Sequence, residues 1–124
     1  MRVLLDTHLF LWAVSAPSRL ASAARKQIDA GDTYVSAASI WEIAIKSGLG
    51  KLTADPVELL AAIEPAGFSL LPVTGEHAAS VARLPPVHKD PFDRLLVAQA
   101  ITEPMILLTN DEALRGYGSL VTVF

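Results

Sequence analysis

Four acidic residues lie at the ends of apolar segments, and their side chains are the best candidates for chemistry in this sequence. Asp6 ends the first apolar segment, Glu42 follows Ile-Trp, Asp93 follows Pro-Phe, and Asp111 follows Leu-Leu-Thr-Asn. A carboxylate near a core is destabilised unless it is paired, and four in one cleft would repel one another. An all-oxygen ligand set of this kind suits Mg²⁺ or Mn²⁺. The four acids therefore predict a metal-dependent enzyme that acts on phosphodiesters.

The elements that must position these acids alternate between short buried strands and helices. Unbroken apolar runs predict the strands, and capping residues, glycine and proline mark the helix ends. The predicted strands are Arg2–Asp6, Thr33–Ser36, Phe68–Val73, Met105–Thr109 and Ser119–Phe124. The predicted helices are Thr7–Val14, Ser18–Ala30, Ser39–Ser47, Pro56–Ala66, Thr74–Leu84 and Pro91–Glu103. This alternation indicates an α/β fold with a parallel sheet covered on both faces.

The four acids are expected at one edge of that sheet. Asp6 and Asp111 fall just past the ends of predicted strands, and Glu42 and Asp93 fall in the first turns of predicted helices. Sites in parallel sheets lie beyond the carboxyl ends of the strands. Asp6 is the strongest candidate, because the pattern offers no helix cap to explain an acid at that position.

Each of the other acids also has an ordinary structural explanation. Ser39 and Glu42 have the spacing of a capping box, and Glu42 could pair with Lys46 one helical turn later. Asp90 before a proline is a good N-cap, and Asp111 could cap a short helix. These explanations do not account for the expected position of all four acids at one edge of the sheet. Taken together they are therefore weaker than each is alone.

Length and composition indicate a single globular domain, residues 1–124. No apolar run approaches the ~20 residues of a membrane-spanning helix, and the first residues are too short for a signal peptide, so we expect a cytoplasmic protein. The absence of cysteine excludes disulfides and thiolate chemistry. A net charge of −3 argues against a general nucleic-acid coat, but not against an enzyme that contacts nucleic acid at one place.

Other functional classes fit the residues less well. His8, His77 and His88 are too dispersed for a histidine metal site, and we expect His88, in a proline-rich loop, to be solvated. A phosphatase with an aspartyl nucleophile would need a second acid two residues after Asp6, where His8 stands. Two rivals are a phospho-accepting signalling domain, whose paired acids and lysine are missing, and a catalytically silent binding module. An activity assay with metal separates the enzyme from the silent module.

Four stretches of the sequence resemble the PIN-domain ribonucleases, and more narrowly the VapC toxins of toxin–antitoxin pairs. They are Leu4–His8, Ser39–Lys46 leading to Gly50–Leu52, His88–Ala100 and Leu108–Asp111. The resemblance spans nearly the whole chain, and the stretch with His-Lys-Asp-Pro-Phe-Asp-Arg is its most specific part. It implies a three-layer α/β/α fold whose five parallel strands have the spatial order 3-2-1-4-5. It also implies an endoribonuclease that uses a Mg²⁺- or Mn²⁺-activated water.

The resemblance also assigns roles to individual residues. The acids of the family fall on Asp6, Glu42, Asp93 and Asp111, and Thr7 and Thr109 match hydroxyls that accompany the first and last acids. Asp90 is an addition found in the branch that carries Asp-Pro-Phe-Asp-Arg, and it either binds metal or only caps a helix. Whether one or two metal ions bind is left open.

Partners are implied as well: a homodimer, RNA as substrate and a cognate VapB-type antitoxin as inhibitor. The mean hydropathy of +0.41 is high for a chain of this size and indicates apolar surface that a protein partner covers. We expect a groove between helices of the first half that receives an amphipathic antitoxin helix. The expected lining residues are Leu9, Phe10, Leu11, Trp12, Ile40, Trp41, Ile45, Leu59, Leu60 and Ile63.

Overall fold

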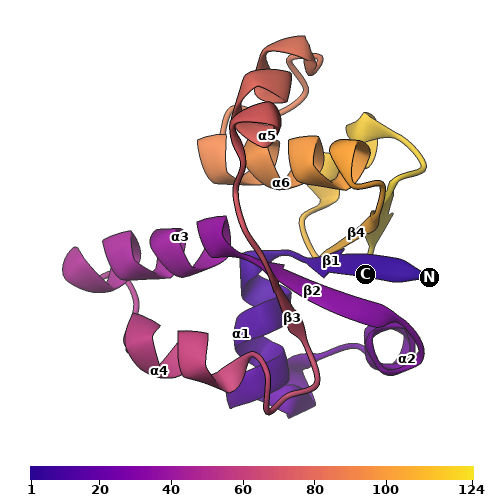
Figure 1. Ribbon diagram of the computed structural model, residues 1–124. Coiled ribbons are helices and arrows are strands. Elements are labelled where there is room, and N and C mark those ends of the chain that lie inside the picture. Colours follow the sequence, from indigo (N-terminus) through magenta and orange to yellow (C-terminus); the bar gives the residue numbers. More distant parts are fainter.

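A five-stranded parallel sheet forms the centre of the computed structural model, which describes all residues 1–124 (Figure 1). The strands are β1 (Arg2–Leu5), β2 (Asp32–Ser36), β3 (Ser69–Leu71), β4 (Ile106–Thr109) and β5 (Val121–Val123). Their order is β3-β2-β1-β4-β5, and every neighbouring pair is parallel. The predicted α/β class and the strand order 3-2-1-4-5 are therefore confirmed.

Helices cover both faces of the sheet and complete the three layers (Figure 1). They are α1 (Thr7–Ser15), α2 (Ser22–Ala30), α3 (Ala37–Gly48), α4 (Pro56–Ala62), α5 (Gly75–Ser80) and α6 (Pro91–Thr102). Three 3₁₀ helices span Pro17–Arg19, Val81–Arg83 and Glu112–Tyr117. No helix combines the length and the apolar content that crossing a bilayer requires.

Strand β1 shows why the apolar runs are unbroken. Val3 and Leu5 belong to a core shared with α1, α2, α3 and α4, whereas Leu4 belongs to a second core shared with α6. Successive side chains of a strand point to opposite faces, so a strand covered on both sides must be apolar at every position. Burial on both faces fixes β1 at the middle of the sheet.

Two predicted helices are divided in the structure. The predicted helix Ser18–Ala30 is a 3₁₀ turn followed by α2, because Leu20 is extended and packs against the core. The predicted helix Thr74–Leu84 is α5 continued by a 3₁₀ turn, and Leu84 is extended. Leu84 precedes a proline, which disfavours the helical conformation at that residue.

The predicted apolar groove is wrong for four of its ten lining residues. The side chains of Leu9, Phe10, Leu59 and Ile63 are buried in the core beneath the sheet. The sequence pattern could not separate them from surface residues, because short helices on a sheet bury an apolar face of their own. Trp41, Ile45 and Leu60 are exposed, as a docking surface requires.

Candidate active site

The carboxyl ends of β1 and β4 meet at one edge of the sheet, where the backbone amide of Asp6 donates to the carbonyl of Leu108 at 2.9 Å. A cavity of about 270 Å³ opens there, and none of its nine lining residues is apolar. The lining residues are Asp6, Thr7, His8, Glu42, Lys46, His88, Asp90, Asp93 and Asp111. The structure therefore brings all five candidate acids together in one place, which we call the acidic cavity.

Asp6 lies at the floor of the acidic cavity and is buried. Its Oδ1 accepts a hydrogen bond from the amide of Leu9 at 2.8 Å, so Asp6 is the N-cap of α1. The expectation that no cap explains this residue was wrong, because α1 begins directly after β1. Its Oδ2 accepts from the hydroxyl of Thr109. Burial raises the pKa of Asp6, and the two hydrogen bonds oppose that rise.

Glu42 is held by two partners and does not take part in a capping box. The helix α3 begins at Ala37 with Ser36 as its N-cap, so Ser39 lies inside the first turn and Glu42 in the second. The hydroxyl of Thr7 donates to Oε1 of Glu42 at 2.7 Å. The ammonium of Lys46 lies 2.6 Å from Oε2, which confirms the predicted ion pair. That hydrogen bond raises the pKa of Lys46, so its side chain stays charged.

Asp90 and Asp93 lie at the start of α6. Oδ1 of Asp90 accepts from the amides of Phe92 and Asp93 at 2.9 and 3.0 Å, which confirms its predicted role as helix cap. Burial, and then the neighbouring Asp90 carboxylate, raise the pKa of Asp93 to about 6. A carboxyl group with a raised pKa in a cavity with other carboxylates is typical of a functional site.

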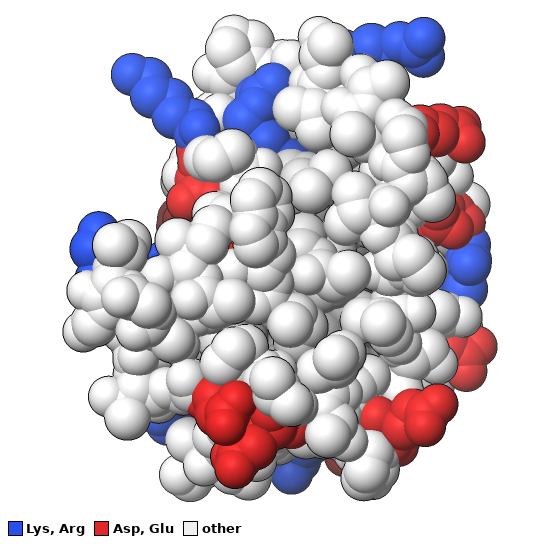
Figure 2. Space-filling model, turned by 60° about the vertical axis from the view of Figure 1, so that its left-hand side comes forward, with Lys and Arg blue, Asp and Glu red and all other residues white.

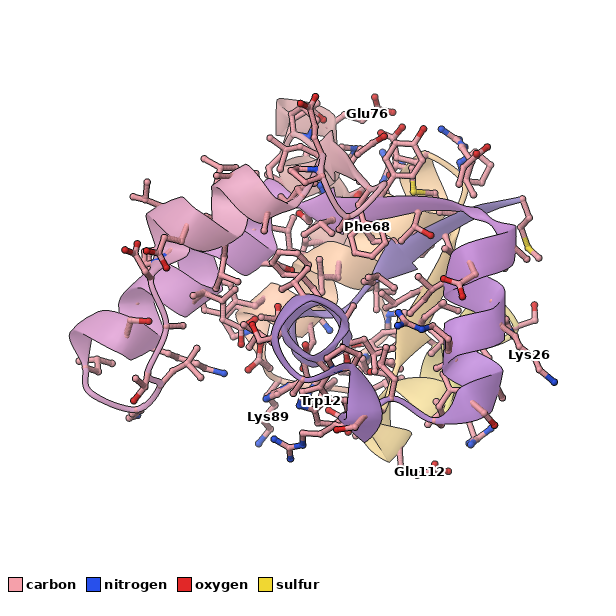
Figure 3. All side chains as sticks on the ribbon, turned by 90° about the horizontal axis from the view of Figure 1, so that it is seen from below. Trp12, Lys26, Phe68, Glu76, Lys89 and Glu112 are labelled. Atoms are coloured by element: carbon pink, nitrogen blue, oxygen red, sulfur yellow. The ribbon has the colours of Figure 1, made fainter.

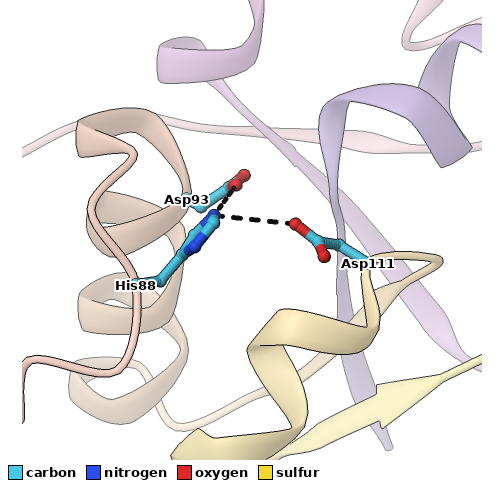
Figure 4. A group of neighbouring side chains, drawn as sticks. All are labelled: His88, Asp93 and Asp111. Carbon is cyan, nitrogen blue, oxygen red and sulfur yellow. Dashed lines mark hydrogen bonds and ion pairs between the residues drawn. The ribbon is translucent and has the colours of Figure 1, made fainter.

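His88 is a member of the site that the sequence analysis missed. Its Nε2 lies 2.9 Å from Oδ2 of Asp93 and 3.6 Å from Oδ2 of Asp111 (Figure 4). Its ring is only partly exposed, so the expectation of a solvated histidine was wrong. The loop is fixed by Tyr117, whose hydroxyl accepts from the amide of His88 at 3.2 Å, and by Arg94. The signal that could have found it is its position just before Asp90, at the entrance to α6.

Asp111 closes the acidic cavity on the β4 side. Its Oδ1 accepts from the amide of Ala113 at 2.9 Å, so it caps the 3₁₀ helix Glu112–Tyr117, as predicted. Its own amide donates to the hydroxyl of Thr109 at 3.0 Å. One ligand atom from each of His88, Asp93 and Asp111 lies within 4.8 Å of the others, a spacing that one metal ion could bridge.

Comparison with known families identifies the fold. The family model described as PIN domain matches residues 3–120. The chain belongs to the PIN-domain family. A curated relative, ribonuclease VapC22 of Mycobacterium tuberculosis, is 33% identical over 123 residues, which cover 93% of this PIN domain and 91% of the relative.

Solved structures with the same fold include DNA-bound VapBC proteins. The PIN domain superposes on a chain of VapBC2 from Rickettsia felis bound to promoter DNA with a TM-score of 0.71 and 13% identity, covering 100% of this chain and 98% of that one. For DNA-bound VapBC from Salmonella typhimurium the TM-score is 0.66 at 16% identity, with 99% and 98% coverage. At such identities the superpositions show the shared fold alone.

The residues of this PIN domain fit a divalent cation. Five carboxylates line the acidic cavity, and Lys46 is the only lysine or arginine among its lining residues. Even with His8 and His88 both protonated, negative groups would outnumber positive ones. Burial is the largest cause of the raised pKa of Asp93, and the negative charges of Asp90 and Glu42 raise it further. Oxygen donors in excess of their counter-charges are the ligand set that Mg²⁺ and Mn²⁺ prefer.

Proposed function

We propose that this PIN domain is the toxin of a VapBC-type pair and hydrolyses phosphodiester bonds of RNA with Mg²⁺ or Mn²⁺ as cofactor. One observation carries the proposal: five carboxylates converge on a cavity that contains a single lysine. The curated relative is named a ribonuclease, which supports RNA as the substrate. We include the cytoplasm in the proposal as the compartment in which the RNA substrate would be met.

Four acids would hold the metal. Asp6 and Asp93 would bind the cation directly, and Glu42 and Asp111 would complete the ligand set. When bound, the cation offsets the charge that develops on the phosphate and lowers the pKa of the attacking water. Asp90 uses Oδ1 for two backbone hydrogen bonds, so we assign it to the helix cap first.

The other polar residues hold these acids in place before a ligand arrives. Thr109 and the amide of Leu9 orient the two oxygens of Asp6. Thr7 and Lys46 fix the two oxygens of Glu42. Carboxylate ligands that already hold their geometry need no reorganisation on binding a cation. This arrangement supports an enzyme rather than a silent binding module, and membership of the PIN family leaves no basis for the signalling domain.

An antitoxin and a second copy of the chain are the proposed protein partners. Uncharged side chains cover the middle of the face that carries α3 and α4, with charged residues around its margin (Figure 2). Its exposed apolar residues are Trp41, Ile45, Leu49, Val57 and Leu60. An apolar surface of this kind, bordered by charge, is typical of a protein interface. The partners in solved VapBC complexes support this part of the proposal by analogy of fold.

An RNA cleavage assay tests the proposal. The purified protein should cleave single-stranded RNA with Mg²⁺ or Mn²⁺ and stop when EDTA is added. Asp6→Asn and Asp93→Asn should abolish cleavage while the protein stays folded, because each removes a ligand charge and relieves repulsion. Full activity of either variant at matched metal concentration would contradict the assignment.

A further inference from the structure

A second cavity adjoins the acidic cavity, and it is lined by cations instead of acids. Its volume is about 270 Å³. Its lining residues are Thr7, His8, Leu11, Ile43, Lys46, Lys51 and Leu52. Thr7, His8 and Lys46 line both cavities, so the two share a wall. We call the second cavity the lysine hollow.

The end of α3 brings the two lysines together. The amide of Lys51 donates to the carbonyl of Lys46 at 2.9 Å, and Gly50 between them has a φ of +72°. This bond from the second residue past the C-cap Leu49, with a glycine in the left-handed region, is the Schellman motif. The chain therefore turns back over the last turn of α3. Lys51 is exposed and belongs to none of the ion pairs in the structure.

The charges of the lysine hollow are suited to an anion. No carboxylate lines it, and the free ammonium of Lys51 adds to the charge of Lys46, which Glu42 already neutralises in part. Leu11, Ile43 and Leu52 form the rest of the wall. Apolar walls lower the effective dielectric, so they strengthen the attraction between a bound anion and an ammonium group. A chain of net charge −3 needs such local cations to hold a nucleic acid.

We propose that the lysine hollow binds the phosphodiester group next to the one that is cleaved in a single-stranded RNA. This inference rests on the proposed nuclease function. Successive phosphates of a strand are separated by one sugar, and two cavities with a common wall can receive two successive phosphates. The cleaved phosphate lies at the acidic cavity, where the cation offsets the acids, and its neighbour lies against Lys51. The hollow therefore sets the path that the strand takes on one side of the cleaved bond.

Lys51→Gln is the variant that tests this inference. It removes one positive charge from an exposed side chain, whereas a change at Lys46 would also release Glu42. Binding is measured on an Asp93→Asn background, which prevents turnover, with an RNA hexanucleotide in a fluorescence anisotropy titration. We expect Lys51→Gln to weaken binding about tenfold, the effect of one lost charge-assisted contact. The slope of log K against log salt should fall by about 0.7, the value for one phosphate contact in a single strand. Lys51→Arg should restore both.

Two lysines provide matched controls. Lys89 is exposed beside the acidic cavity but lines neither cavity, and Lys26 is exposed on α2; both point outward in Figure 3. Lys89→Gln and Lys26→Gln should change the affinity much less than Lys51→Gln. If Lys89→Gln weakens RNA binding as much as Lys51→Gln does, the loss reflects the overall charge of the protein and the inference is overturned. A dinucleotide, which has one phosphodiester, should bind equally well to Lys51→Gln and its parent in an NMR titration.

The inference and the nuclease proposal fail in different ways. If the wild type cleaves RNA but Lys51→Gln does not change the affinity for the hexanucleotide, only the proposal for the lysine hollow is rejected. If binding depends on Lys51 but the wild type shows no metal-dependent cleavage, the proposed nuclease activity is rejected. The distinction between a cleaved and a neighbouring phosphate is then rejected with it.

Discussion

Asp93→Asn should stabilise the metal-free protein, and the gain should grow as the pH rises. Burial, followed by the charge of Asp90, raises the pKa of Asp93 from 3.8 to about 6 in the folded state. Below pH 3.8 both the folded and the unfolded chain carry the proton, so the site causes no loss of stability. As the pH rises, the unfolded chain ionises first, and the folded state loses stability until the pH exceeds about 6. Asparagine has a similar shape but never ionises, so it escapes this loss.

The size of the effect follows from the pKa difference. A shift of about two units corresponds to about 3 kcal/mol at pH 7. About 2 kcal/mol of it falls between pH 4.5 and 7.5, the range in which the folded group ionises. These values are upper bounds, because the side chain of Asp93 is 22% exposed and solvent screens its repulsion.

The assay is urea unfolding in EDTA at pH 4.5, 6 and 7.5. The difference in unfolding free energy between Asp93→Asn and wild type cancels the contributions of groups that titrate alike in both. As the pH rises, the unfolding free energy of Asp93→Asn should increase relative to that of the wild type. Asp29→Asn, at an exposed acid on α2, serves as the control and should show no such trend. Added Mg²⁺ should then stabilise the wild type more than Asp93→Asn, since the variant lacks a ligand charge.

A difference that stays constant with pH would refute this reasoning. It would mean that neither burial nor the neighbouring carboxylates disfavour the ionised form of Asp93 in the folded state. If the wild type instead becomes more stable relative to the variant as the pH rises, His88 stabilises the ionised form of Asp93 more strongly than burial opposes it.

Two further predictions concern the residues around Asp93. His88→Ala should weaken Mn²⁺ binding about 10- to 100-fold in titration calorimetry, because groups that orient ligand carboxylates have effects of this size; unchanged affinity would leave His88 without a role at the metal. Asp90→Ser should keep the thermal stability and most of the RNA cleavage activity, because serine caps a helix nearly as well as aspartate. Loss of cleavage as complete as in Asp93→Asn would instead make Asp90 a metal ligand.

The strands could be predicted from the sequence because their apolar runs are buried on both faces, and a run such as Val3–Leu5 has no other stable position. Helix starts were harder to place. Ser39 and Glu42 have the spacing of a capping box, but Ser36 caps α3 three residues earlier. Local spacing cannot choose between two serines that both suit a cap. The choice depends on where β2 ends, since α3 follows it directly.

Local patterns gave conflicting signals for His88, because its position just before Asp90 pointed to the site whereas its loop pointed to solvent. Its ring lies beside Asp93, which is only five residues away in the sequence, and also beside Asp111, which follows strand β4. A proline-rich loop predicts exposure, but Tyr117, which is distant in the sequence, holds this loop against the site together with the nearer Arg94. Tertiary contacts of this kind are absent from any sequence window.

Capping and ligand roles turn out to be compatible in the same carboxylate. In Asp6, Asp90 and Asp111, Oδ1 accepts from backbone amides at the start of a helix. In Asp6 and Asp111 the other oxygen, Oδ2, lies near a second group of the site, Thr109 and His88 respectively. The cap fixes the rotamer of the side chain, so the second oxygen is held in position at no further entropic cost. This is why asparagine is the informative substitution. It caps a helix as well as aspartate does, so at these positions Asn removes the charge and keeps the fold, whereas alanine would remove both.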